Sequence, residues 1–132
     1  MEPWEDYRPP TDLELTFFRI VTRGFPELEA QIELCQIADY DPEGWWHVRA
    51  IDGPPLLLGN PLDGPSLHIH EPADRYLQIL IWTTRRGMLD LLEVLDTTEK
   101  GDTLEQHELV RAYIDADLAG RLQYDPLGKW RR

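Results

Sequence analysis

Histidine is the residue type with the clearest chemical potential in this sequence. His68 and His70 are separated by one residue, so on a strand both side chains point to the same face. Glu71 and Asp74 follow closely, and His47 lies on a neighbouring predicted strand. Imidazole nitrogens and carboxylate oxygens are common transition-metal ligands. One hypothesis is therefore a small metal-dependent or ligand-binding enzyme that uses His47, His68 and His70.

The same spacing has a purely structural interpretation, in which Leu67 and Ile69 face the core and both histidines face solvent. The sequence contains no Walker pattern, dinucleotide-binding glycine fingerprint, nucleophile elbow or paired cysteine motif. We therefore expect no catalytic residue, no cofactor and no bound metal, and we keep the three histidines as the candidate ligands if a metal binds.

Period-two alternation on the predicted strands separates an apolar face from an outward face rich in aromatic residues. The residues expected to point inward are Trp46, Val48, Ala50, Leu77, Ile79 and Ile81. Among those expected to point outward are Gln78 and Leu80. The outward candidates for partner binding are Trp45, His47, Arg49, His68, His70, Tyr76 and Trp82. Aromatic and arginine side chains are enriched in protein interfaces, so this face predicts a docking surface. The alternative is that helices cover it and make it a second core layer.

Other polar residues have simpler interpretations. His107 lies between Leu104 and Val110 on a predicted helix and is expected to be a partly buried structural histidine. Cys35, the single cysteine, is expected to be a small buried apolar residue. The acidic side chains of the same helix are expected to form a solvated face rather than a catalytic carboxylate pair, and they are Glu105, Glu108, Asp115 and Asp117.

The elements that position these residues are predicted from local signals. An extended arm (1–10) precedes a helix that Thr11 and Glu14 cap and Gly24 stops. A short second helix begins at Pro26 and ends near Gln31. The remaining predicted elements are strands at 32–39, 45–51, 66–70, 76–82 and 88–96, a turn at 41–44, loops at 52–65 and 97–102, a helix from a capping box at 103–106 to Gly120 or a residue nearby, and an irregular tail at 121–132.

This order predicts an α+β fold with two N-terminal helices, an antiparallel meander of about five strands and one C-terminal helix. In the last helix, Leu104, Val110, Ile114 and Leu118 are expected to form the buried stripe. With 132 residues, the chain is expected to form a single domain (1–132).

Charge narrows the possible partners. The chain has a net charge of −12, and residues 1–66 hold 13 acidic and 4 basic side chains. Such a field repels phosphate backbones and attracts basic proteins, so we expect a basic protein partner and no nucleic acid. No apolar run is long enough to cross a bilayer, and the first residues do not resemble a signal peptide. We therefore expect no membrane association and a cytoplasmic location, which suits a lone thiol.

Two stretches carry a family resemblance. The residues are Tyr7-Arg8-Pro9-Pro10-Thr11 followed by Pro26-Glu27-Leu28-Glu29-Ala30-Gln31-Ile32, and later Gly87-Met88-Leu89-Asp90-Leu91-Leu92-Glu93-Val94. Across about 7–40 and 76–102, the chain resembles small acidic proteins of actinobacterial type, some of which look like immunity proteins of polymorphic toxin systems. The use of eleven arginines against two lysines fits a high-GC genome. The region 52–75 has no counterpart in this resemblance.

The resemblance implies a non-enzymatic acidic protein that occludes a basic partner such as a toxin domain. Two alternatives remain open, namely the histidine-based enzyme described above and a homodimeric structural domain joined through its exposed sheet face.

Overall fold

The computed structural model describes residues 7–40, 44–70, 74–96 and 104–124. Along the chain lie α1 (Asp12–Val21), α2 (Pro26–Gln31), the short 3-10 helix η2 (Ile32–Leu34), β1 (Cys35–Ile37), β2 (Trp45–Ala50), β3 (Leu62–Ile69), β4 (Arg75–Thr83), β5 (Leu89–Asp96) and α3 (Gln106–Leu118). The predicted α+β class, with helices at both ends of the order and an antiparallel sheet between them, is confirmed.

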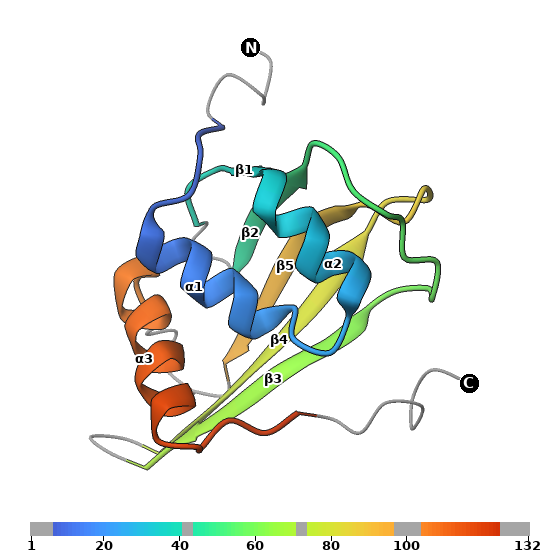
Figure 1. Ribbon diagram of the computed structural model, residues 1–132. Coiled ribbons are helices and arrows are strands. Elements are labelled where there is room, and N and C mark those ends of the chain that lie inside the picture. Colours follow the sequence, from blue (N-terminus) through green and yellow to red (C-terminus); the bar gives the residue numbers. More distant parts are fainter. Residues whose placement is uncertain (1–6, 41–43, 71–73, 97–103, 125–132) are drawn as a thin grey trace.

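The sheet has the order β1-β2-β5-β4-β3, and every neighbouring pair is antiparallel. The predicted meander therefore holds for β3, β4 and β5 but does not extend through the whole sheet. After β2 the chain crosses to the far edge to form β3, and β5 then returns to the centre beside β2 (Figure 1). As a result, β5 is the central strand.

Both edge strands are paired in part by segments from the ends of the described chain. On the β1 side, Arg8 and Ile37 exchange backbone hydrogen bonds of 2.9 and 2.7 Å. On the β3 side, Ser66 and Gln123 exchange bonds of 2.8 and 3.0 Å. An open edge invites another strand, and here the middle of β3 and the end of the three-residue β1 are already occupied.

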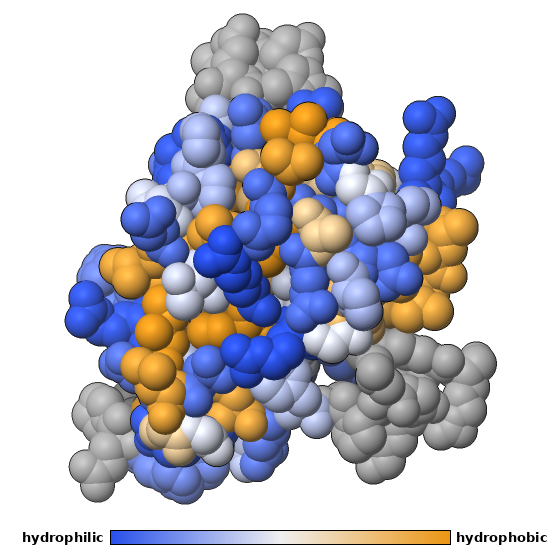
Figure 2. All heavy atoms as spheres, in the orientation of Figure 1, coloured by the Kyte–Doolittle hydropathy of each residue, from blue (hydrophilic) through white to orange (hydrophobic). Residues whose placement is uncertain are grey.

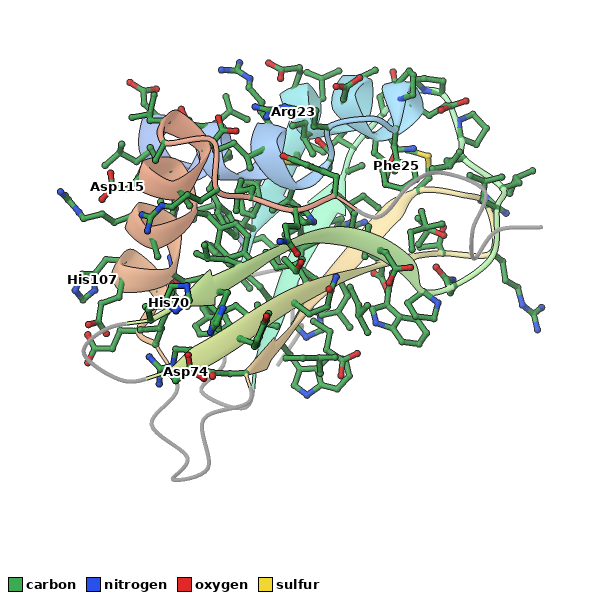
Figure 3. The ribbon with its side chains drawn as sticks, turned by 90° about the horizontal axis from the view of Figure 1, so that it is seen from below. Arg23, Phe25, His70, Asp74, His107 and Asp115 are labelled. Atoms are coloured by element: carbon green, nitrogen blue, oxygen red, sulfur yellow. The ribbon has the colours of Figure 1, made fainter. Side chains whose placement is uncertain are left out.

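The three helices lie on one side of the sheet, with α3 packed beside α1 (Figures 1 and 3). They bury the sheet face that carries Trp46, Ile79 and Ile81. Phe17 stacks on Trp46 at a centroid distance of 5.5 Å and meets Tyr113 of α3 edge-on at 5.6 Å. One aromatic cluster thus joins α1, the sheet and α3.

The first helix begins as predicted. The Thr11 hydroxyl accepts a hydrogen bond from the Glu14 backbone N–H, and the Glu14 carboxylate accepts one from the Thr11 N–H. The spacing of Leu13, Phe17, Ile20 and Val21 predicts one inward stripe, and Leu15 and Phe18, off that stripe, allow a second buried face. In the structure Phe18 is buried, but Leu13 is 58% exposed. Glu14 takes the buried position next to it because its carboxylate is fully engaged in hydrogen bonds. Gly24 lies in the turn after α1, in the left-handed region at φ 94°.

Two strand predictions need correction. The predicted strand at 32–39 is a 3-10 turn over Ile32–Leu34 followed by only three strand residues. Conversely, the predicted loop at 52–65 ends early, because β3 begins at Leu62. Pro65 lies inside β3 at an irregularity in the β3–β4 pairing between Asp63 and Ser66. Proline is tolerated in a sheet at such a bulge, which explains why a proline-rich stretch still enters the sheet.

The predicted start and stripe of the last helix are also corrected. Glu105 is the N-cap, and its side chain and that of Glu108 form the reciprocal capping box. Of the predicted stripe, Val110 is buried, Leu104 and Ile114 are partly buried against the core, and Leu118 is 82% exposed. The other buried residues of the helix are Leu109, Tyr113 and Ala116. The helix is rotated relative to the predicted stripe because the large Tyr113 ring, rather than Leu118, fills the core beside Phe17.

Several predictions fall outside the described residues: most of the arm at 1–10, most of the turn at 41–44, the loop at 97–102, Thr103 and most of the tail. Within the described part of the chain, none of the helices combines the length and the apolar character needed to span a bilayer.

Candidate functional site

The sheet face opposite the helices carries the predicted outward side chains of the strands. In Figure 3 the helices lie on one side of the sheet only, and no described helix or strand covers the other side. Burial alternates accordingly, because Trp46 and Val48 are buried whereas His47 and Arg49 are exposed. We call this surface the open face. It comprises the outward side chains of β2, β5, β4 and β3.

The register of the strands places its side chains in rows. His47, Leu91 and Trp82 form one row across β2, β5 and β4. Trp45, Glu93 and Leu80 form the next row. Leu95 and Gln78 follow, and then Tyr76 and His68 pair across β4 and β3. Two tryptophans on separate strands therefore flank the central strand.

The predicted inward and outward orientations on β2 and β4 are confirmed. Leu77, Ile79 and Ile81 are buried, and among the outward residues Trp45 and Trp82 are half-buried and Tyr76 is 50% exposed. Ala50, expected to point inward, is only partly buried at the end of β2. The question of which face the helices cover is settled in favour of the Trp46 face.

Sequence reasoning missed the contribution of the central strand to this face. Leu91, Glu93 and Leu95 point outward between Trp45 and Trp82, alternating with the buried Leu92 and Val94. That alternation is visible in the sequence, but no residue near it in the chain indicates that β5 lies between β2 and β4. Glu93 accepts a 3.1 Å hydrogen bond from Trp82 Nε1, so it fixes the indole from the middle of the open face.

A second group of polar side chains lies where β3 ends and β4 begins. His68 Nε2 is 2.5 Å from Asp74 Oδ1, and His70 Nδ1 is 4.0 Å from the same oxygen. The centroids of the His68 and His70 rings are 4.0 Å apart. The His68 ring also stacks on the Tyr76 ring, with a centroid distance of 4.1 Å and an interplanar angle of 9°. We call His68, His70 and Asp74 the hairpin cluster. Figure 3 labels His70 and Asp74 of this cluster.

His47 does not belong to this cluster. It lies on β2, and β5 and β4 separate that strand from β3. Neighbouring strands are about 4.8 Å apart, so the predicted three-histidine set is not brought together. Asp74 takes the place of the third candidate ligand, whereas Glu71 lies outside the described residues.

A groove of about 440 Å³ runs between α1 and α3. Leu13, Val110 and Ile114 supply its apolar wall, and Figure 2 shows apolar surface along this side of the molecule. Glu14 lines the same groove. Hydrogen bonds from Arg8 lower the pKa of the Glu14 carboxyl to about 2, against the effect of its burial. This carboxylate is engaged by Arg8, Thr11 and Gln106, which suits a structural role rather than that of a general acid.

Two further residues are placed by the structure. His107 is exposed on the first turn of α3, so the predicted partial burial of its side chain is wrong. It follows the capping residue Glu105 and faces solvent because the rotated helix turns Leu109 and Val110 inward instead. Cys35 is buried, as predicted, and burial raises the pKa of its thiol to about 11. A thiol of that pKa is a poor nucleophile at neutral pH.

Comparison of the chain with protein-family models, curated proteins and solved structures found no match.

Proposed function

We propose that this chain is a non-enzymatic binding protein that docks through its open face onto a protein partner with a basic surface, in the manner of an immunity protein that occludes a toxin domain. The observation that supports the proposal is the uncovered sheet face with Trp45 and Trp82 on either side of the central strand. Aromatic side chains of this kind are the usual anchors of protein interfaces.

The pairing of both sheet edges favours the face over the edges as the docking surface. Strand addition needs free backbone N–H and C=O groups along an edge strand. Arg8 already pairs with Ile37 on β1, and Gln123 pairs with Ser66 on β3. Each edge is therefore occupied in part, whereas no described helix or strand covers the open face.

Charge selects the type of partner. A net charge of −12 makes two copies of this chain repel each other, which disfavours a homodimer. The same charge attracts a basic surface and accelerates the encounter, in a manner that added salt screens.

Glu93 gives the open face a specific polar contact at its centre. Its carboxylate lies in the row between Trp45 and Leu80 and already holds the Trp82 indole. An arginine or lysine of the partner that reaches Glu93 would be flanked by apolar and aromatic side chains. Such a charge-assisted bond in a desolvated centre is typical of an interface hot spot.

The test uses the protein encoded by the neighbouring gene, because an immunity-type protein is expected to be encoded directly after its toxin. Binding is measured by surface plasmon resonance with the wild type, a Trp45→Ala/Trp82→Ala variant and a Leu118→Ala control. Leu118 is exposed on α3, away from the sheet. We expect the double variant to weaken binding at least tenfold, the control to match the wild type, and the association rate to fall with ionic strength.

Three results would contradict the proposal. They are equal binding by the double variant, an association rate that does not respond to salt, and a wild type that sediments as a dimer which the Trp45→Ala/Trp82→Ala exchange dissociates. The last result would assign the open face to self-association instead. The cytoplasmic location expected from the sequence belongs to this proposal as well.

A further inference from the structure

We infer that the hairpin cluster of His68, His70 and Asp74 is a binding site for a divalent transition-metal ion of the zinc type. One potential ligand atom of each residue lies within 4.8 Å of the other two. The inference concerns one end of β3 and β4 and does not depend on the proposed function of the open face.

The distances within the hairpin cluster are close to those that a metal requires. Zinc binds histidine nitrogen and carboxylate oxygen at about 2.0–2.2 Å, so its ligand atoms lie about 3.3 Å apart in a tetrahedral site. His68 Nε2 and Asp74 Oδ1 are closer than this, at 2.5 Å, and His70 Nδ1 is 4.0 Å from Asp74 Oδ1. Small side-chain rotations would bring all three atoms to one ion.

The fold restricts the most buried of the three ligands. His68 lies opposite Tyr76 in the β3–β4 register, and the two rings stack at 4.1 Å. This packing holds the His68 imidazole with its Nε2 toward Asp74. A ligand that is already oriented loses less conformational entropy when a metal binds.

The donor set identifies the class of metal. Two imidazole nitrogens and one carboxylate oxygen suit Zn²⁺ and its neighbours in the first transition row, whereas Mg²⁺ and Ca²⁺ prefer oxygen ligands throughout. Three protein ligands leave at least one coordination position for water or a group from another molecule.

A hydrogen bond between His68 and Asp74 that merely links the end of β3 to the start of β4 is the competing explanation. That role requires one imidazole. The structure also brings His70 against the His68 ring and toward the same Asp74 oxygen, although His70 is exposed and could extend into solvent. Convergence of a second imidazole is what a metal site needs and what a single hydrogen bond leaves unexplained.

The experiment titrates Zn²⁺ into untagged, chelator-treated protein by isothermal titration calorimetry. We expect one saturable site, with affinity at least tenfold lower in His68→Ala, His70→Ala and Asp74→Asn, since even loss of a group that only supports a ligand costs about tenfold or more. The chain has four histidines. The matched control is therefore the His47→Ala/His107→Ala variant, which removes the other two and should bind as the wild type does.

A second measurement keeps the test decisive if a variant folds poorly. In the wild type, Zn²⁺ should shift the imidazole NMR resonances of His68 and His70 and leave those of His47 and His107 in place. The inference is overturned if the wild type shows no saturable binding, if the control variant loses affinity as the cluster variants do, or if all four imidazoles respond alike. None of these results depends on whether the open face binds a partner.

Discussion

Gln106 Nε2 donates a 2.6 Å hydrogen bond to Glu14 Oε2, which joins the first turn of α3 to the first turn of α1 across 92 residues of sequence. Arg8 donates two further bonds of 2.8 Å to the same carboxylate, one to each oxygen. The Thr11 backbone N–H donates another at 2.8 Å. One buried carboxylate thus connects the N-terminal arm, the cap of α1 and the start of α3.

Replacing Glu14 by glutamine should destabilise the protein by roughly 2 kcal/mol at pH 7, because charge-assisted hydrogen bonds contribute about 1.5–3 kcal/mol. Arg8 holds the pKa of folded Glu14 at about 2, below its ordinary value of 4.5. The charged form therefore stabilises the fold above about pH 4.5, and this contribution is lost as the pH falls toward 2. Urea unfolding at pH 7 and pH 3 measures the difference between wild type and variant.

That difference should shrink at pH 3, and one of constant size would contradict the assigned pKa. Glu33→Gln is the matched control, since Glu33 pairs with Arg19 on the surface. Exposed ion pairs contribute about 0–1 kcal/mol, so this variant should unfold nearly as the wild type does at both pH values.

Gln31 should be the most sensitive polar residue of the core. Its Nε2 donates to the carbonyl oxygens of Pro54 and Gly87 at 2.7 and 2.9 Å, and its Oε1 accepts from the Leu89 N–H at 2.6 Å. Gln31→Leu keeps a similar volume but removes the Gln31 partner of the Pro54 carbonyl oxygen and of the Leu89 N–H, whereas the Gly87 oxygen keeps its 2.9 Å hydrogen bond from the Leu56 N–H. Each unsatisfied buried group costs about 1–3 kcal/mol, so we expect a loss of roughly 3 kcal/mol by chemical denaturation.

Gln36→Leu is the control for that exchange, because Gln36 is only half-buried on β1. It should change the free energy of unfolding by less than about 1 kcal/mol. Equal effects of the two substitutions would show that Gln31 does not hold the 54–56 segment and the β4–β5 turn together as the hydrogen bonds indicate.

The sequence predicts those parts of the fold that local chemistry determines. The capping box at Thr11 and Glu14 and the alternation around Trp45 and Trp46 are short-range patterns, and the structure has them where expected. The sequence Arg85-Arg86-Gly87 likewise predicts a turn before β5, and the structure has it there with Gly87 at positive φ. In each case the residues that fix the conformation are neighbours along the chain.

Predictions from the sequence fail where contacts between residues far apart in the chain determine the structure. Strand order is such a case, since nothing near Leu91 or Glu93 reveals that β5 enters between β2 and β4. Leu13 is exposed because Arg8 and Gln106 hold its neighbour Glu14 in the buried position. The hairpin cluster can be predicted from the sequence only in part. The His68–His70 spacing is visible there, but the approach of Asp74 to these histidines depends on the β3–β4 register.

Gly87→Ala should be more destabilising than Gly24→Ala, although both glycines have positive φ. The left-handed backbone costs a residue with a Cβ about 1–2 kcal/mol at either position. At Gly87 a Cβ would also lie 2.7 Å from the backbone N and O of Leu56, whereas nothing lies within 4 Å at Gly24. Crowding should add about 1–3 kcal/mol at Gly87 alone, and thermal unfolding of both variants checks this order.

The two adjacent tryptophans of β2 should differ sharply in their contribution to stability. Trp46 is fully buried, contacts Phe17 and Phe18 at centroid distances of 5.5 and 5.0 Å, and donates a 2.8 Å hydrogen bond to the Ala38 carbonyl oxygen. Trp46→Ala should cost about 3–5 kcal/mol. Trp45 is half-buried on the open face, so Trp45→Ala should cost less than about 1 kcal/mol. Denaturant unfolding followed by far-UV circular dichroism compares them. A loss of several kcal/mol in a monomeric Trp45→Ala variant would mean that the open face is part of the core, and the proposed docking surface would then be wrong.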